Sequence, residues 1–81
     1  MTPAQCRAAR SLLDMTQSQL ADASGLGLST VVDFEKQRRS ISPEAKVKLH
    51  DALLSAGIQF IDENGGGPGV RLRKPQASKK K

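Results

Sequence analysis

Residues 16–35 read TQSQLADASGLGLSTVVDFE, and this stretch decides the fold of the chain. It opens with Thr16, whose hydroxyl can cap a helix, and a glutamine follows three positions later as in a capping box. Gly25 stands where a left-handed backbone conformation can end a short helix without steric cost. A further helical segment follows, with Val31 and Phe34 on one face. The stretch therefore predicts two short helices joined by a tight turn.

The spacing within residues 16–35 suits a helix-turn-helix. Two short helices that cross at a steep angle need a small side chain where their backbones approach, and Ala21 is placed there. Apolar side chains bury one face of the second helix, which leaves its other face free to enter a DNA groove. The helical spacing places on this free face Leu28, Ser29, Val32, Asp33 and Lys36.

Comparable signals flank the central stretch on both sides. Residues 2–5 (TPAQ) combine a hydroxyl cap with a proline at the first helical position, and they predict a helix up to about Met15. Residues 42–44 (SPE) start another helix, which Gly57 ends. The second helix of the central stretch is expected to continue to about Gln37. With the two flanking helices, we expect four helices in all.

Beyond the fourth helix the pattern changes from helical to β. Residues 58–61 (IQFI) are short and β-prone, residues 70–73 (VRLR) alternate strictly, and a glycine-rich loop separates the two segments. We therefore expect a β-hairpin in which Val70 and Leu72 face inward.

Three segments are expected along this mainly α chain. Residues 1–57 form a helix-turn-helix DNA-binding domain, residues 58–73 a hairpin suited to dimerisation, and residues 74–81 a disordered basic tail. The net charge is +5, but most of the basic excess lies after residue 57. Charge alone is therefore weak support for nucleic-acid binding.

Composition excludes several function classes. With 81 residues the chain is too short for an enzyme with a deep cleft. Its single cysteine, Cys6, and single histidine, His50, leave no disulfide, no metal cluster and no nucleophile–base pair. We therefore expect no enzyme activity, no metal and no cofactor. No apolar run approaches ~20 residues and no signal peptide is present, so we expect a cytoplasmic protein without a membrane partner, associated with the nucleoid when bound to DNA.

The chain resembles the phage repressor and Cro-like helix-turn-helix regulators, also called the xenobiotic-response-element (XRE) type. The resemblance covers about residues 4–57 and is carried by residues 16–21 (TQSQLA) and 31–35 (VVDFE). It implies a four-helix, lambda-repressor-like domain that binds double-stranded DNA. It also implies a structural salt bridge between the first and third helices, at Arg10 and Glu35.

The resemblance implies roles for individual residues as well. Gln17 matches a glutamine that meets a phosphate at the start of the second helix, where helix N–H groups are free. The free face of the third helix becomes the base-reading surface, with Thr30 nearer the DNA backbone. Arg38 and Arg39 follow this helix as phosphate contacts. The implied DNA-binding residues are Gln17, Leu28, Ser29, Thr30, Val32, Asp33, Lys36, Arg38 and Arg39.

The recognition helix departs from the family pattern at its start. Gly27 and Leu28 stand where polar residues are usual, and the early face carries no Arg, Asn or Gln for bidentate base contacts. Leu28 and Val32 could instead contact thymine methyl groups, Ser29 could read either base type, and Asp33 could accept from cytosine N4. We therefore expect modest direct readout in each half-site and more dependence on dimer spacing and DNA shape.

Dimerisation is expected through the fourth helix and the hairpin. Val47 and Leu54 lie seven positions apart, off the main apolar stripe of the fourth helix. An unpaired hairpin edge beside them would be a liability unless it were covered. A symmetric homodimer would cover both and place two recognition helices about 34 Å apart on a palindrome. The expected interface residues are Val47, Leu54, Phe60, Val70 and Leu72.

Two hypotheses of function follow. The first is a sequence-specific transcriptional regulator that binds a palindromic operator through the major groove, with autoregulation as one form of control. The second is a protein-interaction module on the same fold, antitoxin-like or anti-activator, that captures a protein partner and binds DNA weakly or not at all. The apolar Leu28 and the acidic Asp33 on the recognition face favour this alternative.

Overall fold

The computed structural model describes residues 1–73 as four helices followed by an antiparallel two-stranded hairpin. The elements are α1 (Pro3–Leu13), α2 (Gln17–Ser24), α3 (Leu28–Glu35), α4 (Pro43–Ser55), β1 (Ile58–Ile61) and β2 (Gly69–Leu72). The predicted fold class, mainly α with a C-terminal hairpin, is confirmed. The tail predicted for residues 74–81 lies outside the described residues.

Hydroxyl side chains start three of the four helices. Thr2 and Thr16 each form a complete capping box, in which the threonine oxygen accepts from a backbone N–H and a glutamine side chain accepts in return. Ser42 accepts from the backbone N–H of Ala45 at the start of α4. The exception is α3, which begins after Gly27 and therefore has no side-chain cap. Local chemistry thus places the helix starts where the sequence predicts them.

Two helices end earlier than predicted. The first ends at Leu13 rather than near Met15, because Asp14 adopts a left-handed conformation with φ of 53°. The third ends at Glu35 rather than near Gln37, because Gln37 is left-handed with φ of 57°. Both turns reverse the chain direction at residues other than glycine, where the left-handed conformation is uncommon.

The core is mainly aliphatic and draws on every helix and on β1. Its buried members are Cys6, Ala9, Leu20, Ala21, Val31, Phe34, Ile41, Ala45, Leu49, Leu53 and Ile58. Ala21 is 4% exposed, and its carbonyl accepts from the backbone N–H of Leu26 across the turn between α2 and α3. The small residue therefore lies where the two helices approach, and Gly25 ends α2 with φ of 74°.

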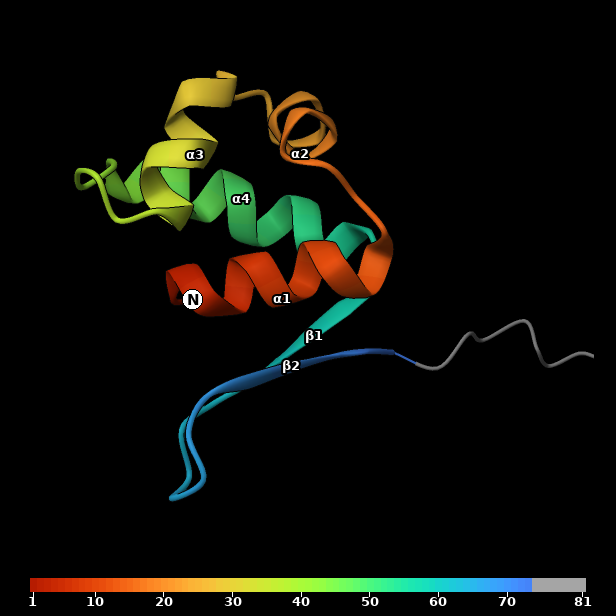
Figure 1. Cartoon of the computed structure of the whole chain (residues 1–81). Coiled ribbons are helices and arrows are strands. Elements are labelled where there is room, and N and C mark those ends of the chain that lie inside the picture. Colours follow the sequence, from red (N-terminus) through yellow and green to blue (C-terminus); the bar gives the residue numbers. More distant parts are fainter. Residues whose placement is uncertain (74–81) are drawn as a thin grey trace, which may run out of the picture.

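The helix-turn-helix and the hairpin lie on opposite sides of α1. In Figure 1, α2 and α3 lie above α1 and α4, while β1 and β2 cross below α1. Gln5 is buried and holds the hairpin in place, since its Nε2 donates to the carbonyl oxygen of Gly69 at 2.9 Å and to that of Ile61 at 3.5 Å. The hairpin therefore leaves the outer surface of α3 uncovered.

The hairpin register places apolar residues opposite one another on the face toward the helices. Phe60 pairs with Val70, and both pack against the core. Ile58 pairs with Leu72 and is fully buried, but Leu72 is 47% exposed. Leu72 therefore lies on the inward face, as predicted, but it is not buried, because it is the last residue of β2 and the helices of one copy do not cover it.

Candidate nucleic-acid interface

Helix α3 buries one face and exposes the other. Val31, Phe34 and Glu35 are buried, and α3 packs against α2 and α1. Among the predicted base-reading residues, the exposed ones are Leu28, Ser29 and Lys36, and the half-buried ones are Thr30, Val32 and Asp33. Ser29 and Asp33 are one turn apart, so they share the outward face. This outward face therefore combines the apolar Leu28, the polar Ser29 and the acidic Asp33.

The loop after α3 carries two exposed arginines. Gln37 turns the chain, and the backbone N–H of Arg38 donates to the carbonyl oxygen of Asp33 at 2.9 Å. Arg39 then returns toward the helix, and its Nε donates to Oδ2 of Asp33 at 2.6 Å. Arg39, which is predicted to contact a phosphate, is thereby paired with Asp33, which is predicted to contact a base. Arg38 is exposed beside them.

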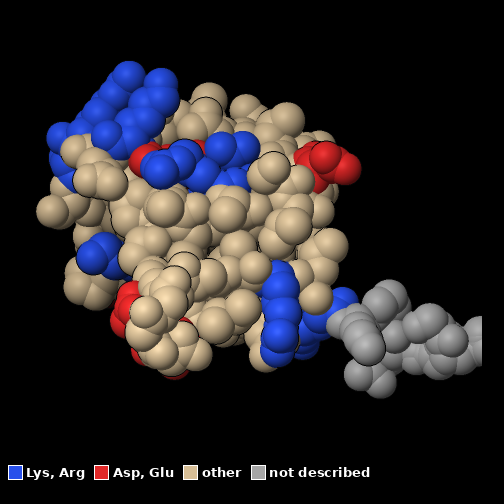
Figure 2. All heavy atoms as spheres, turned by 60° about the horizontal axis from the view of Figure 1, so that its bottom comes forward, with Lys and Arg blue, Asp and Glu red and all other residues tan. Residues whose placement is uncertain are grey.

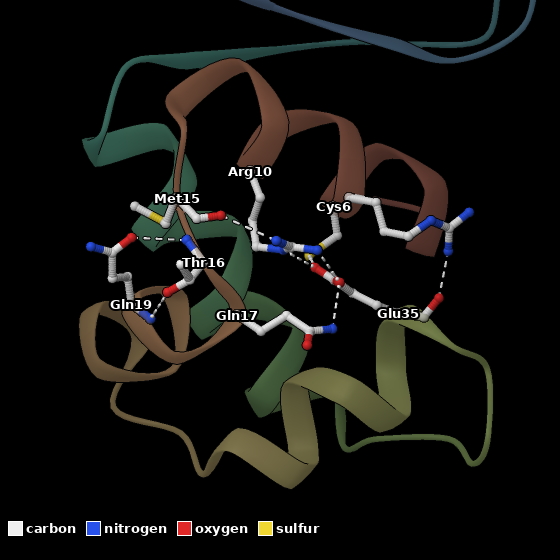
Figure 3. Close-up of polar contacts among 8 residues, drawn as sticks. Cys6, Arg10, Met15, Thr16, Gln17, Gln19 and Glu35 are labelled. Atoms are coloured by element: carbon white, nitrogen blue, oxygen red, sulfur yellow. Dashed lines mark hydrogen bonds and ion pairs between the residues drawn. The ribbon is translucent and has the colours of Figure 1, made fainter.

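Glu35 is the centre of a buried polar cluster that joins α1, α2 and α3 (Figure 3). Arg10 donates to both carboxylate oxygens at 2.7 Å, through Nε to Oε2 and through Nη2 to Oε1. Cys6 donates from Sγ to Oε2 at 3.2 Å. Arg10 also donates to the carbonyl oxygen of Met15 at 3.1 Å, which attaches the loop before α2. The fork of two hydrogen bonds fixes both partners of the ion pair.

Gln17, the first residue of α2, belongs to the same cluster. Its Nε2 donates to Oε1 of Glu35 at 3.0 Å, and its side chain points toward Glu35 in Figure 3. The residue is half-buried, so this amide is not a freely exposed group. The first backbone N–H groups of a helix lack partners within it. Glu35 therefore holds the start of α2 in a defined position relative to α3.

The charges of this cluster perturb one another. Burial alone would raise the pKa of Glu35, but hydrogen bonds from Arg10, Gln17 and Cys6 and the charge of Arg10 hold this pKa below its ordinary value. The hydrogen bond to Glu35 raises the pKa of Arg10. Burial, and then the hydrogen bond to Glu35, raises the pKa of the Cys6 thiol, which stays protonated as the donor. The folded protein therefore favours an ionised Glu35.

A family model described as helix-turn-helix matches residues 7–53, more than half of the chain. The matched region runs from α1 into α4 and includes Arg10, Gln17 and Glu35 of the polar cluster and the whole of α3. The chain belongs to the XRE-type helix-turn-helix family. This XRE-type domain is a DNA-binding regulatory domain. No curated protein matches the chain significantly.

The described part of the chain was also compared with two other features, a metal site and a membrane-spanning helix. Within residues 1–73, no group of three or more His, Cys, Asp or Glu side chains could hold a metal ion. Over the same residues, no helix is both long and apolar enough to cross a membrane.

The residues expected at the dimer interface lie along α4 and the hairpin. Val47 and Leu72 are 56% and 47% exposed, and Leu54, Phe60 and Val70 are half-buried. His50 connects the two elements, because its ring stacks on Phe60 with 4.6 Å between ring centroids. Figure 2 looks toward the hairpin side, where uncharged atoms occupy most of the middle of the face. In this domain the five residues thus lie on two adjoining elements.

Sequence reasoning missed several contacts of the site. The Asp33–Arg39 pair spans six positions, which no helical spacing brings together. The bond from Gln17 to Glu35 and the bond from Cys6 to Glu35 join separate helices. The sequence signal near these contacts was the family resemblance at Arg10 and Glu35, which implied a structural salt bridge between the first and third helices.

Proposed function

We propose that this protein is a sequence-specific transcriptional regulator that binds a palindromic operator through the major groove as a homodimer. The observation that carries the proposal is the outward face of α3. Its opposite face is buried against α1 and α2, while Leu28 and Ser29 at the start of the helix and Lys36 at its end are exposed, with half-buried Asp33 between them. A short helix fixed in this way can present side chains to base edges with little loss of conformational entropy.

Phosphate contacts would position α3 in the groove. The start of α2, held by Glu35 through Gln17, offers backbone N–H groups to one strand. Arg38 and Lys36 are exposed at the other end of α3 and suit a second phosphate. Contacts at both ends would set the register, and the face between them would read the sequence.

A homodimer would supply a second recognition helix for the second half of the palindromic operator. Val47 and Leu72 expose apolar surface that one copy leaves uncovered. The hairpin that carries Leu72 lies on the other side of α1 from α3 (Figure 1). A two-fold interface there would cover the hairpin edge and set the half-site spacing near 34 Å, one turn of DNA.

The test is fluorescence anisotropy with DNA from upstream of the protein's own gene and with a scrambled duplex, each at two salt concentrations. We expect a preference for the upstream DNA that persists at the higher salt, with log affinity falling by about 0.9 per phosphate contact. Equal binding that the higher salt abolishes would contradict the proposal for this DNA, and a genomic selection would then seek another target.

Replacing Ser29 and Val32 together with alanine is expected to weaken operator binding at least tenfold and to relax base preference. Each poorly read base pair costs about 1–3 kcal/mol, and both residues lie on the reading face. The melting temperature should change little, because Ser29 is exposed and Val32 is half-buried. Binding to scrambled DNA and the Ser55→Ala variant serve as controls. An unchanged base preference would remove α3 from the readout.

A protein-interaction module is the second candidate, and the exposure of Leu28 favours it. This leucine is 47% exposed at the start of α3, where an apolar side chain suits a protein surface better than a DNA groove. The same anisotropy experiment separates the two functions. No salt-dependent binding to any duplex, together with tight capture of one protein partner that Leu28→Ala abolishes, would establish the second function.

A further inference from the structure

Asp33 and Arg39 form the ion pair nearest to the proposed reading face. Nε of Arg39 lies 2.6 Å from Oδ2 of Asp33, and the two side chains are 59% and 18% exposed respectively. Asp33 is therefore largely held in place, although it points from the outward side of α3. An acidic residue so close to a groove lined by phosphates would be repelled unless a cation accompanied it.

The turn after α3 builds this pair. Gln37 adopts the left-handed conformation, and the backbone N–H of Arg38 closes onto the carbonyl oxygen of Asp33 at 2.9 Å. The chain therefore reverses so that Arg39, six positions after Asp33, reaches back to its carboxylate. Asp33 thus accepts both the side-chain hydrogen bond from Arg39 and the backbone hydrogen bond from Arg38. Together these two bonds restrict the rotamer of Asp33.

Only one carboxylate oxygen is used. Oδ2 accepts from Arg39, whereas Oδ1 accepts no hydrogen bond from residues 1–73. An ionised carboxylate can only accept, and cytosine presents a lone donor, the N4 amino group, in the major groove. Adenine offers a donor beside an acceptor, and guanine offers two acceptors, so both suit a carboxylate less well.

We propose that Arg39 is a positioning residue for base readout, which holds Asp33 through Oδ2 so that Oδ1 accepts from the N4 amino group of one cytosine in each half-site. The inference rests on the proposed function and deepens it. It assigns Arg39 a role different from the phosphate contact that the family resemblance implies. Arg38, which is exposed one position earlier, keeps the phosphate role.

The experiment begins with the wild-type protein and a pool of random duplexes, from which a preferred site is selected. Affinities are then measured by anisotropy for all four base pairs at each position of that site. We expect one position per half-site where cytosine is preferred about five- to tenfold, the low end for a mismatched base pair. Asp33→Asn and Arg39→Ala should both reduce this preference below about twofold. Arg38→Ala should lower affinity for all four base pairs by one common factor.

The outcomes separate the inference from the proposed function. A wild-type protein that enriches no sequence would overturn both. A selected site whose cytosine preference survives in Arg39→Ala, with equal losses on every base pair, would make Arg39 a phosphate contact and overturn the inference alone. Loss of folding does not obscure the result, because the Arg39 side chain of the ion pair is 59% exposed and a pair open to solvent contributes little to stability, so melting temperatures should stay close to wild type. Asp62→Asn, the same charge change in the hairpin loop, should leave the base preference unchanged.

Discussion

Arg10→Ala is expected to lower the free energy of unfolding by about 3–5 kcal/mol, the usual cost of leaving a buried charge without its partner. The side chain of Glu35 is fully buried and receives two hydrogen bonds from Arg10 at 2.7 Å. Because the total stability of a small domain is about 5–15 kcal/mol, this loss would remove between about a fifth and all of it. Urea denaturation followed by circular dichroism measures the difference.

The ion pair between Arg39 and Asp33 provides a matched control. Arg39 pairs with Asp33 at 2.6 Å, but its side chain is 59% exposed, so Arg39→Ala should cost less than about 1 kcal/mol. The double variant Arg10→Ala with Glu35→Gln should recover part of the loss, because a neutral amide needs no counter-ion. Similar losses for the two single arginine variants would show that burial of Glu35 does not determine the cost.

Acid is expected to destabilise the protein through the same carboxylate. The pKa of Glu35 is lower in the folded protein than its ordinary value of 4.5. Its contribution to stability is therefore complete above pH of about 5 and is lost as the pH falls through the lowered, folded pKa. Melting temperatures from pH 7 to pH 2 measure the effect. In Glu35→Gln this part of the acid dependence should disappear, and an unchanged pH profile would contradict the assignment.

The local parts of the fold could be predicted because their signals are local. Thr2, Thr16 and Ser42 start helices through bonds to residues three positions away, and Gly25 ends one through its own backbone freedom. The ends of α1 and α3 were harder to predict, because a left-handed residue other than glycine leaves little trace in the sequence. Gln37 is such a residue.

The tertiary contacts of the site could not be predicted from local patterns. Gln5 completes the capping box of α1, and its side chain also bonds to the carbonyl oxygen of Gly69, 64 positions away. Asp33 and Arg39 were treated as independent contacts, because their pairing depends on the turn at Gln37. The sequence identified residue types and faces, but the partners of polar side chains follow from how the helices pack.

Val47→Asp together with Leu72→Asp is expected to convert the protein to a monomer and to lower its affinity for a palindromic operator by about 100-fold or more. The two residues are 56% and 47% exposed in one copy, so neither change removes core packing. In the proposed dimer each would bury a carboxylate without a partner, which interfaces disfavour strongly. A monomer also loses the high effective concentration of the second recognition helix, which supplies about 10²–10⁴ in avidity.

Light scattering and anisotropy together test this prediction. The double variant should scatter as a monomer, bind an isolated half-site as well as wild type does, and lose the advantage of the palindrome. Ser55→Asp with Gln59→Asp is the matched control: it adds the same two charges to α4 and β1, at exposed positions outside the proposed interface. Gln59 pairs with Arg71 on the opposite face of the hairpin, so this variant should remain a dimer. A double variant that stays dimeric would place the interface elsewhere. A control that also dissociates would show that association depends on net charge and not on the apolar surface around Val47 and Leu72.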